Sequence, residues 1–267
     1  MELPLFKIRA SQAHNILGGA FNKPTAKQLA ELDRLQEKAD TGKITDKQRE
    51  TLQELIDKRD AKPVLQDGAI TYLQKWMKER IYERRHEFTN QYVEKGKLCE
   101  PEAIQLVSEY MGYTDCKKNE QPAEDEYMTG ECDVEMPEII EEIKNSWDAF
   151  TFPLFATELP DTKYYFQGQV YMKLYNKKRA AINYCLINAP ESMIDAEARR
   201  AAYQAGYSEV DMELYEQVRA KLTYDNIPVK FRIKRFEIER NDAVIETIQQ
   251  RVILCREYIE SEWKKLF

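Results

Sequence analysis

The sequence has no long apolar run, and this absence argues against a membrane-spanning helix. Of its 267 residues, 43% are hydrophobic and 33% are charged, and no uninterrupted apolar stretch approaches the roughly 20 residues that cross a bilayer. The first residues also lack the longer apolar core of a signal peptide. We therefore expect a globular cytoplasmic protein, long enough to bury a sizeable core in one large α/β domain or two small ones.

Cysteine and histidine are scarce and scattered. No C-x-x-C pair is present, which argues against a zinc or iron–sulfur site, and the odd number of cysteines argues against a disulfide framework. We expect free thiols at Cys99, Cys116, Cys132, Cys185 and Cys255. The two histidines, His14 and His86, give no evident pairing with a nucleophile. Neither G-x-x-x-x-G-K-[ST] nor G-x-G-x-x-G occurs, so nucleotide-driven activity is not expected.

The formal net charge of −7 argues against a nucleic-acid-binding protein. This argument is weak, because DNA contact depends on local basic patches and not on the average field. Three such patches occur, each of which could equally be a solvated face. They are Arg80/Arg84/Arg85, Lys173/Lys177/Lys178/Arg179 and Lys230/Arg232/Lys234/Arg235. We select Lys177, Lys178 and Arg179 as candidate DNA-binding residues.

Helical patterns dominate the N-terminal third. Ser11 is a plausible N-cap of a first helix. Residues 22–62 are predicted to form a charged helical hairpin, because Thr25-Ala-Lys-Gln28 and Thr45-Asp-Lys-Gln48 each match a capping box. The hairpin is interpreted as an insertion in a single domain spanning residues 1–267, either solvated or serving as an interaction arm. A further helix is expected from about Ala69 to Arg85.

The rest of the chain alternates between helical and strand patterns. Helices are expected from near Pro101 to Gly112, over 164–175 and 191–222, and from about 242 to 265. Strands are expected on either side of the turn at Met136-Pro137, over 180–187, and over 229–238 with a bulge near Lys234-Arg235. The simplest architecture is α/β (α+β): a central mixed β-sheet flanked by helices.

One segment is typical of a metal site. If two adjacent strands meet there, Asp133 and Glu142 can direct their carboxylates to one point, where they would bind a hard cation such as Mg²⁺. Glu142 and Lys144 are two residues apart and share a strand face. Ile143 points into the core but can offer its backbone carbonyl as a ligand, while Lys144 would assist a water or a phosphate. Alone, such a pair is more often an exposed ion pair; the apolar residues around it favour a buried strand.

Two other elements have residues of matching chemistry. Glu100 lies at the start of a helix, where it either approaches the same metal site or merely interacts with the helix dipole. Gln167 and Tyr171 are four residues apart on a helix and share a face. Gln167 could hold a phosphate or a water, and Tyr171 could stack on a base or brace Lys144; the alternative is a Tyr/Met core stripe.

Taken in order, these segments resemble the YqaJ/lambda exonuclease family of phage recombination nucleases, in the PD-(D/E)XK superfamily with its restriction-endonuclease-like core. The matching residues are Ile8, Ala10, Ser11 and His14; Gly96, Lys97, Glu100 and Ala103; Asp133; Glu142-Ile143-Lys144 with Asn145-Ser146-Trp147; and the Y-x-x-Q-x-Q stretch at Gln167. The resemblance spans roughly residues 8 to 190, interrupted by the hairpin.

The resemblance implies a Mg²⁺-dependent exonuclease that digests one strand of linear duplex DNA from its 5′ end and leaves 3′ overhangs. Two metal ions are implied, with Mn²⁺ as a possible substitute, held by Asp133, Glu142, the Ile143 carbonyl and Glu100. Lys144 and Gln167 match catalytic positions, and Ser11 matches a residue near the 5′ phosphate. The family also implies a trimer, a single-strand annealing partner and, for a phage protein, the host cytoplasm.

The chain departs from the family at two places. Val134 replaces the glycine that usually follows the first metal aspartate, and the arginine that precedes Ser11 has no match, leaving Lys7 or Arg9 to substitute. Two other functions remain open: a structure-selective or nicking endonuclease on the same core, and a non-catalytic module that binds DNA or a protein. The combination of Asp133, Glu142 and Lys144 counts against the second.

Overall fold

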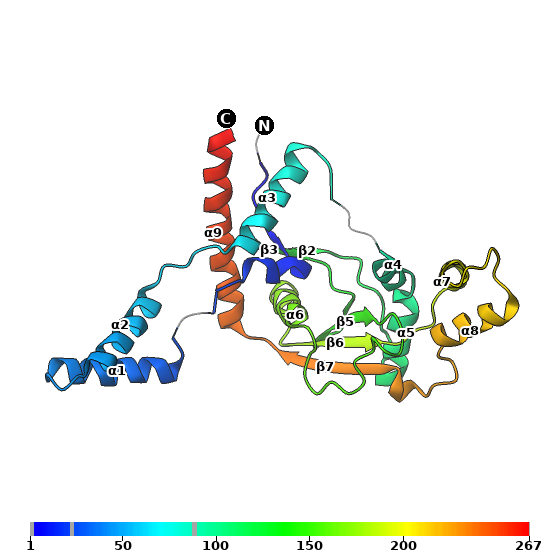
Figure 1. The fold of residues 1–267 in the computed structure, drawn as a ribbon, viewed down its shortest axis with the longest axis horizontal. Helices are drawn as coiled ribbons and strands as arrows, with labels where there is room; N and C mark the ends of the chain where they lie inside the picture. The colour runs from blue at the N-terminus through cyan, green and yellow to red at the C-terminus, as the bar shows by residue number, and fades with distance from the viewer. Residues whose placement is uncertain (1–2, 22–23, 87–89, 267) are drawn as a thin grey trace. The chain divides into compact units, whose positions relative to one another are not determined.

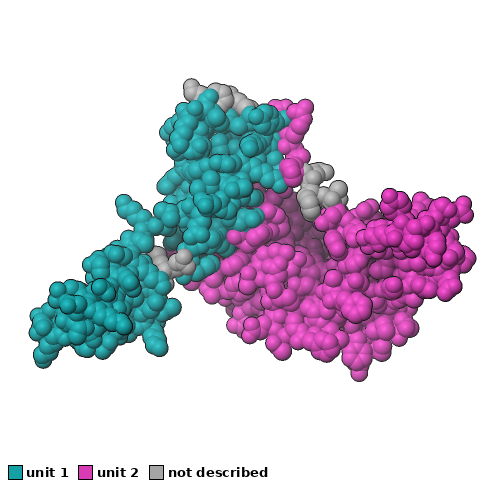
Figure 2. All heavy atoms as spheres, in the orientation of Figure 1, with its two compact units in different colours: residues 1–6, 15–82, 247–267 teal, residues 7–14, 83–246 magenta. Residues whose placement is uncertain are grey.

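The structure is a computed structural model that describes residues 3–21, 24–86 and 90–266, and the chain divides into two compact units (Figures 1 and 2). Unit 1 comprises residues 1–6, 15–82 and 247–267, and unit 2 comprises residues 7–14 and 83–246. The single nuclease domain with an inserted hairpin stays a prediction, and residues 22 and 23 of that hairpin lie outside the described residues.

Unit 1 is built from helices: α1 (Ala26–Asp40), α2 (Asp46–Asp60), α3 (Asp67–Ile81) and the part of α9 (Asp242–Leu266) from residue 247 onward. Both predicted capping boxes are present, at Thr25 and Thr45, and Gly42 adopts a positive φ in the turn between α1 and α2. Leucines from the two helices form their shared core: Leu32, Leu35, Leu52 and Leu55. Local capping signals therefore located this hairpin correctly.

Unit 2 contains two mixed sheets flanked by helices, which confirms the predicted fold class but with two sheets in place of one. The first has the order β1-β3-β2 and the second β4-β5-β6-β7, and each combines parallel and antiparallel pairs. The strands are β1 (Ile8–Arg9), β2 (Ala123–Glu124), β3 (Met128–Gly130), β4 (Val134–Glu135), β5 (Ile139–Asn145), β6 (Arg179–Cys185) and β7 (Ile233–Glu239).

Helices cover both faces of the second sheet (Figure 1). Ile143 of β5 packs in one apolar cluster with residues of α5, whereas Glu142, the preceding residue, hydrogen-bonds to α6. Adjacent strand residues point to opposite faces, so α5 and α6 lie on opposite sides of β5. The remaining elements are η1 (Ala10–Ile16), α4 (Gln91–Leu98), α5 (Glu100–Met111), α6 (Thr162–Leu174), α7 (Glu191–Gln204), α8 (Met212–Leu222) and η2 (Val229–Phe231).

Several sequence predictions of local structure need correction. Ser11 does not cap a helix but lies inside the 3₁₀ helix η1 (Ala10–Ile16). Gly96 lies inside α4, a helix that the sequence patterns did not predict and that Asn90 caps. The strand predicted over 229–238 begins as the 3₁₀ turn η2, and β7 then pairs with β6 residue by residue without a bulge. The apolar residues of β7 do not alternate with a period of two, because both faces of the sheet are covered and apolar side chains are buried on each.

Within the part of the chain that the structure describes, no helix combines the length and the apolarity needed to cross a membrane.

Candidate active site

The buried carboxylate of Glu142 is the centre of the candidate site. Glu142 lies in the middle of β5 with 2% of its surface exposed. Its Oε1 accepts hydrogen bonds from Lys144 Nζ at 2.6 Å and from Gln167 Nε2 at 2.6 Å. Its Oε2 is buried without a hydrogen-bond partner. A buried charged oxygen without a partner costs free energy, so this atom is poised for a cation or another donor.

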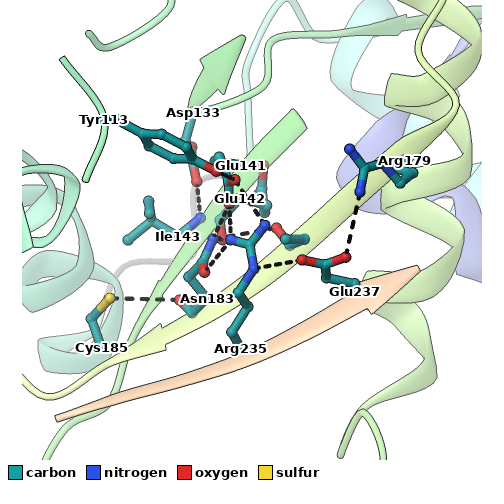
Figure 3. Close-up of polar contacts among 11 residues, drawn as sticks. Tyr113, Asp133, Glu141, Glu142, Ile143, Arg179, Asn183, Cys185, Arg235 and Glu237 are labelled. Atoms are coloured by element: carbon teal, nitrogen blue, oxygen red, sulfur yellow. Dashed lines mark hydrogen bonds and ion pairs between the residues drawn. The ribbon is translucent and has the colours of Figure 1, made fainter. Parts of the chain in front are cut away.

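Asp133 is tied to the same strand through the backbone. It precedes β4, which pairs antiparallel with β5, and its Oδ2 accepts a hydrogen bond from the Ile143 N–H at 2.6 Å (Figure 3). Burial, and then the nearby Glu142 carboxylate, raises the pKa of Asp133. The hairpin of β4 and β5 thus brings two carboxylates into electrostatic contact, as predicted, at a point where their negative charges repel.

Lys144 faces Glu142 and an aromatic ring. Burial alone would lower the pKa of Lys144, but the Glu142 and Asp133 carboxylates outweigh it and raise that pKa. The lysine therefore stays protonated and partly neutralises the carboxylates. Its Nζ also lies 4.8 Å from the centre of the Tyr164 ring, within the range of a cation–π contact. Sequence reasoning missed Tyr164 as a residue of the site. Its position three residues before Gln167 on α6 places both side chains on one helix face, and this spacing could have identified it.

Gln167 and Tyr171 form a second layer around Glu142. Gln167 Nε2 contacts Glu142 and also the Tyr171 hydroxyl, at 3.0 Å. Tyr171 therefore braces Gln167 and not Lys144, and because it is buried its ring is not available to stack on a base, contrary to the sequence interpretation. Burial, and then Glu142, raises the pKa of Tyr171 well above its usual range. A Cβ at Gly130 would come within 2.8 Å of the Tyr171 ring, so only glycine fits there.

A buried ion pair lies on the opposite face of β5 (Figure 3). Glu141 is fully buried and pairs with Arg235 of β7, whose Nη1 contacts Glu141 Oε2 and whose Nη2 lies 3.0 Å from Oε1. Asn183 Nδ2 and the Tyr113 hydroxyl donate to the same carboxylate at 2.7 and 2.6 Å. These contacts link β5, β6 and β7 directly behind Glu142. We define these four residues as the Glu141 network.

Sequence reasoning missed a buried lysine near the end of β5. Lys95 of α4 is 1% exposed, and its Nζ donates to the carbonyls of Ser146 at 2.9 Å and Trp147 at 2.7 Å. Burial lowers its pKa to about 8. Because its partners lie about fifty residues away in sequence, no local pattern identifies this contact, which holds the chain as it leaves Lys144.

Other predicted site residues lie elsewhere or have other partners. Glu100, at the start of α5, pairs with Lys118 at 3.0 Å. Ser11 is exposed at the start of η1, and Lys7, a suggested cation near it, pairs with Glu124 at 3.1 Å.

The patch at 177–179 is only partly free. Lys177 pairs with Glu135 at 2.8 Å, whereas Lys178 and Arg179 are exposed. Lys178 and Arg179 therefore remain the accessible cations of this patch.

The site has two carboxylates that could hold a divalent cation. Within residues 3–21, 24–86 and 90–266, no group of three or more histidine, cysteine or acidic side chains converges as a metal cluster. Mg²⁺, however, commonly binds through one or two carboxylates together with waters and substrate phosphates. The unpartnered Glu142 Oε2 and the raised pKa of Asp133 both indicate that negative charge is unfavourable at this point, and a cation would relieve this cost. The donor set therefore fits Mg²⁺ or Mn²⁺.

In this mixed sheet flanked by helices, an acid–x–lysine strand lies beside a second aspartate, an arrangement compatible with a nuclease. The structural comparisons agree. A phage-related exonuclease from Haemophilus somnus 129PT matches with a TM-score of 0.70 and 26% identity, over 99% of this chain and 98% of that chain. An alkaline exonuclease, LHK-Exo from Laribacter hongkongensis, matches with a TM-score of 0.55 and 14% identity, over 98% and 92%.

The same alkaline exonuclease in complex with dAMP gives the same TM-score of 0.55 and 14% identity. No family model and no curated protein matches the sequence. The resemblance of the chain to the YqaJ/lambda exonuclease family is confirmed by these exonuclease structures, of which the first covers nearly its whole length.

Proposed function

We propose that this chain is a metal-dependent deoxyribonuclease that digests linear double-stranded DNA as an exonuclease. The observation that carries the proposal is the buried Glu142 carboxylate, which Lys144 and Gln167 hold by one oxygen while the other has no partner. The likeness to exonucleases along nearly the full chain supports the same activity. The finer proposal is 5′ to 3′ digestion that leaves 3′ overhangs.

Asp133 and Glu142 would hold Mg²⁺, with the Ile143 carbonyl as a further ligand and Glu100 as a contributor if its pair with Lys118 opens. The cation would offset charge on the scissile phosphate and acidify a water. Lys144, a protonated cation beside Glu142, would orient that water and stabilise the charge that develops on the phosphate. Gln167 keeps Glu142 in position. Two metal ions, as the resemblance implies, are part of the proposal.

The DNA itself would be held outside this centre. Ser11, exposed on η1, is proposed to lie near the terminal 5′ phosphate, and Lys178 and Arg179 to contact the backbone. A homotrimer and a single-strand annealing partner also belong to the proposal.

The test is digestion of linear duplex DNA labelled separately at each 5′ and 3′ end, in Mg²⁺, in Mn²⁺ and in EDTA. We expect metal-dependent release of 5′-labelled nucleotides by the wild type and by Lys264→Ala, an exposed lysine of α9 that serves as a matched control. Lys144→Ala should lower the rate by at least about a hundredfold.

Each other outcome assigns the chain differently. Release from the 3′ end would refute the polarity. Cleavage of covalently closed circles would favour a structure-selective or nicking endonuclease. Absence of hydrolysis of linear, nicked and circular DNA with both metals would leave a non-catalytic binding module.

A further inference from the structure

The loop between β5 and α6 presents two phenylalanines to solvent. Phe150 is 97% exposed and Phe155 is 92% exposed. Phenylalanine is among the side chains most often buried in proteins, because exposure of its ring to water is unfavourable. Two nearly complete exposures in one loop give this surface two apolar rings that no described residue of this chain covers.

The loop is anchored, so the exposed rings are not the result of a free chain. Phe152, between them, is buried and packs in a small apolar cluster with Leu186 and Tyr224. The Asp148 carboxylate accepts a hydrogen bond from the Phe150 N–H at 3.0 Å. The loop therefore turns Phe152 inward and leaves Phe150 outward, and the fixed backbone reduces the entropy that would be lost when a ligand covers Phe150.

The loop also connects two elements of the candidate active site. It begins after Asn145, the end of β5, and enters α6 at Thr162, five residues before Gln167. Phe150 is six residues beyond Lys144, and six residues span at most about 20 Å. A strand whose phosphate lies at Glu142 and Lys144 would therefore have its neighbouring nucleotides within reach of this loop.

The charges of the loop indicate which part of a nucleic acid it would contact. Residues 146–161 contain no lysine or arginine but include Asp148, Glu158 and Asp161. Such a segment does not attract phosphates, whereas aromatic rings stack on the uncharged faces of bases. Two cations lie just outside the loop: Lys144 and Lys163 both approach the ring of Tyr164, and they pair with Glu142 and with Asp161.

We propose that Phe150 and Phe155 stack on nucleobases of the DNA strand that is processed at Glu142 and Lys144. This binding site for unpaired bases rests on the proposed nuclease function and adds the residues that hold the strand end. The other occupants of an exposed aromatic pair, a protein partner or a second copy of this chain, are outcomes of the test.

The test is binding of a single-stranded oligonucleotide that contains 2-aminopurine, in EDTA so that no hydrolysis contributes. The variants are Phe150→Ala with Phe155→Ala, the matching double leucine variant, and Tyr203→Ala as a control, an exposed aromatic on α7. We expect the double alanine variant to bind about tenfold or more weakly, with an unchanged slope of log Kd against log salt, since no phosphate contact is lost. Melting temperatures should stay near that of the wild type.

The fluorescence separates stacking from apolar contact. Stacking predicts that 2-aminopurine emission is quenched by the wild type and by Tyr203→Ala, and that neither double variant quenches it. A leucine variant that binds and quenches like the wild type would overturn stacking. Unchanged Kd in the double alanine variant, or loss of self-association in sedimentation without loss of DNA binding, would overturn the proposal. Base binding without hydrolysis would sustain it while refuting the nuclease.

Discussion

Removal of the Arg235 guanidinium is a sharp test of the Glu141 network. In Arg235→Met, the fully buried Glu141 carboxylate keeps only the neutral donors Asn183 and Tyr113. Loss of one partner from a buried ion pair costs about 3–5 kcal/mol, because the remaining charge is uncompensated. For a chain of this size each kcal/mol lowers Tm by about 2–4 °C, so we expect a decrease of roughly 6–20 °C.

The assay is thermal unfolding followed by circular dichroism, with two matched variants. Arg179→Met, on neighbouring β6, removes an exposed arginine whose contact with Glu237 is 3.9 Å, and should change stability by less than about 1 kcal/mol. The double variant Arg235→Met with Glu141→Gln removes both charges and should recover part of the loss. A Tm for Arg235→Met within about 2–3 °C of wild type would correspond to a loss of only ~1 kcal/mol and would refute the reasoning. Strictly additive effects of the Arg235 and Glu141 substitutions on stability would refute it as well.

Three further predictions concern the surface, a glycine and a lysine. Charge reversal at Lys178 and Arg179 should weaken DNA binding and flatten its salt dependence; an unchanged slope would remove this patch from the interface. Gly130→Ala would place a methyl group 2.8 Å from Tyr171, and we expect a loss of about 1–3 kcal/mol, which a wild-type Tm would contradict. Burial lowers the pKa of Lys95 from 10.5 to about 8, so between these pH values the folded chain binds fewer protons than the unfolded chain, and the contribution of Lys95 to stability rises with pH. The free energy of unfolding of the wild type minus that of Lys95→Met should therefore grow by up to about 3 kcal/mol across this window; in chemical unfolding, a flat difference would contradict the lowered pKa.

Features that depend on near neighbours were predictable. The period of two along a strand placed Glu142 and Lys144 on one face, and the contact of 2.6 Å agrees. The capping boxes at Thr25 and Thr45 and the left-handed Gly112 located three helix ends, because each signal acts within one turn of backbone. The catalytic and metal-binding roles of the site residues, in contrast, are still predictions.

Other features arise only when distant segments pack together. The local sequence around Glu141 gives no sign that this acidic side chain is buried. It is buried because α5 covers the face of β5 opposite to α6. Arg235 compensates its charge from a strand more than ninety residues away in sequence. Glu100 has a lysine partner in a later loop.

Lys95 donates hydrogen bonds to two backbone carbonyls directly after the end of β5. The sequence by itself indicated many of the helices and strands and the candidate reactive groups, since both depend on local backbone and side-chain chemistry. The tertiary structure decided which charges are buried and paired, because desolvation and ion pairing depend on which segments meet in space.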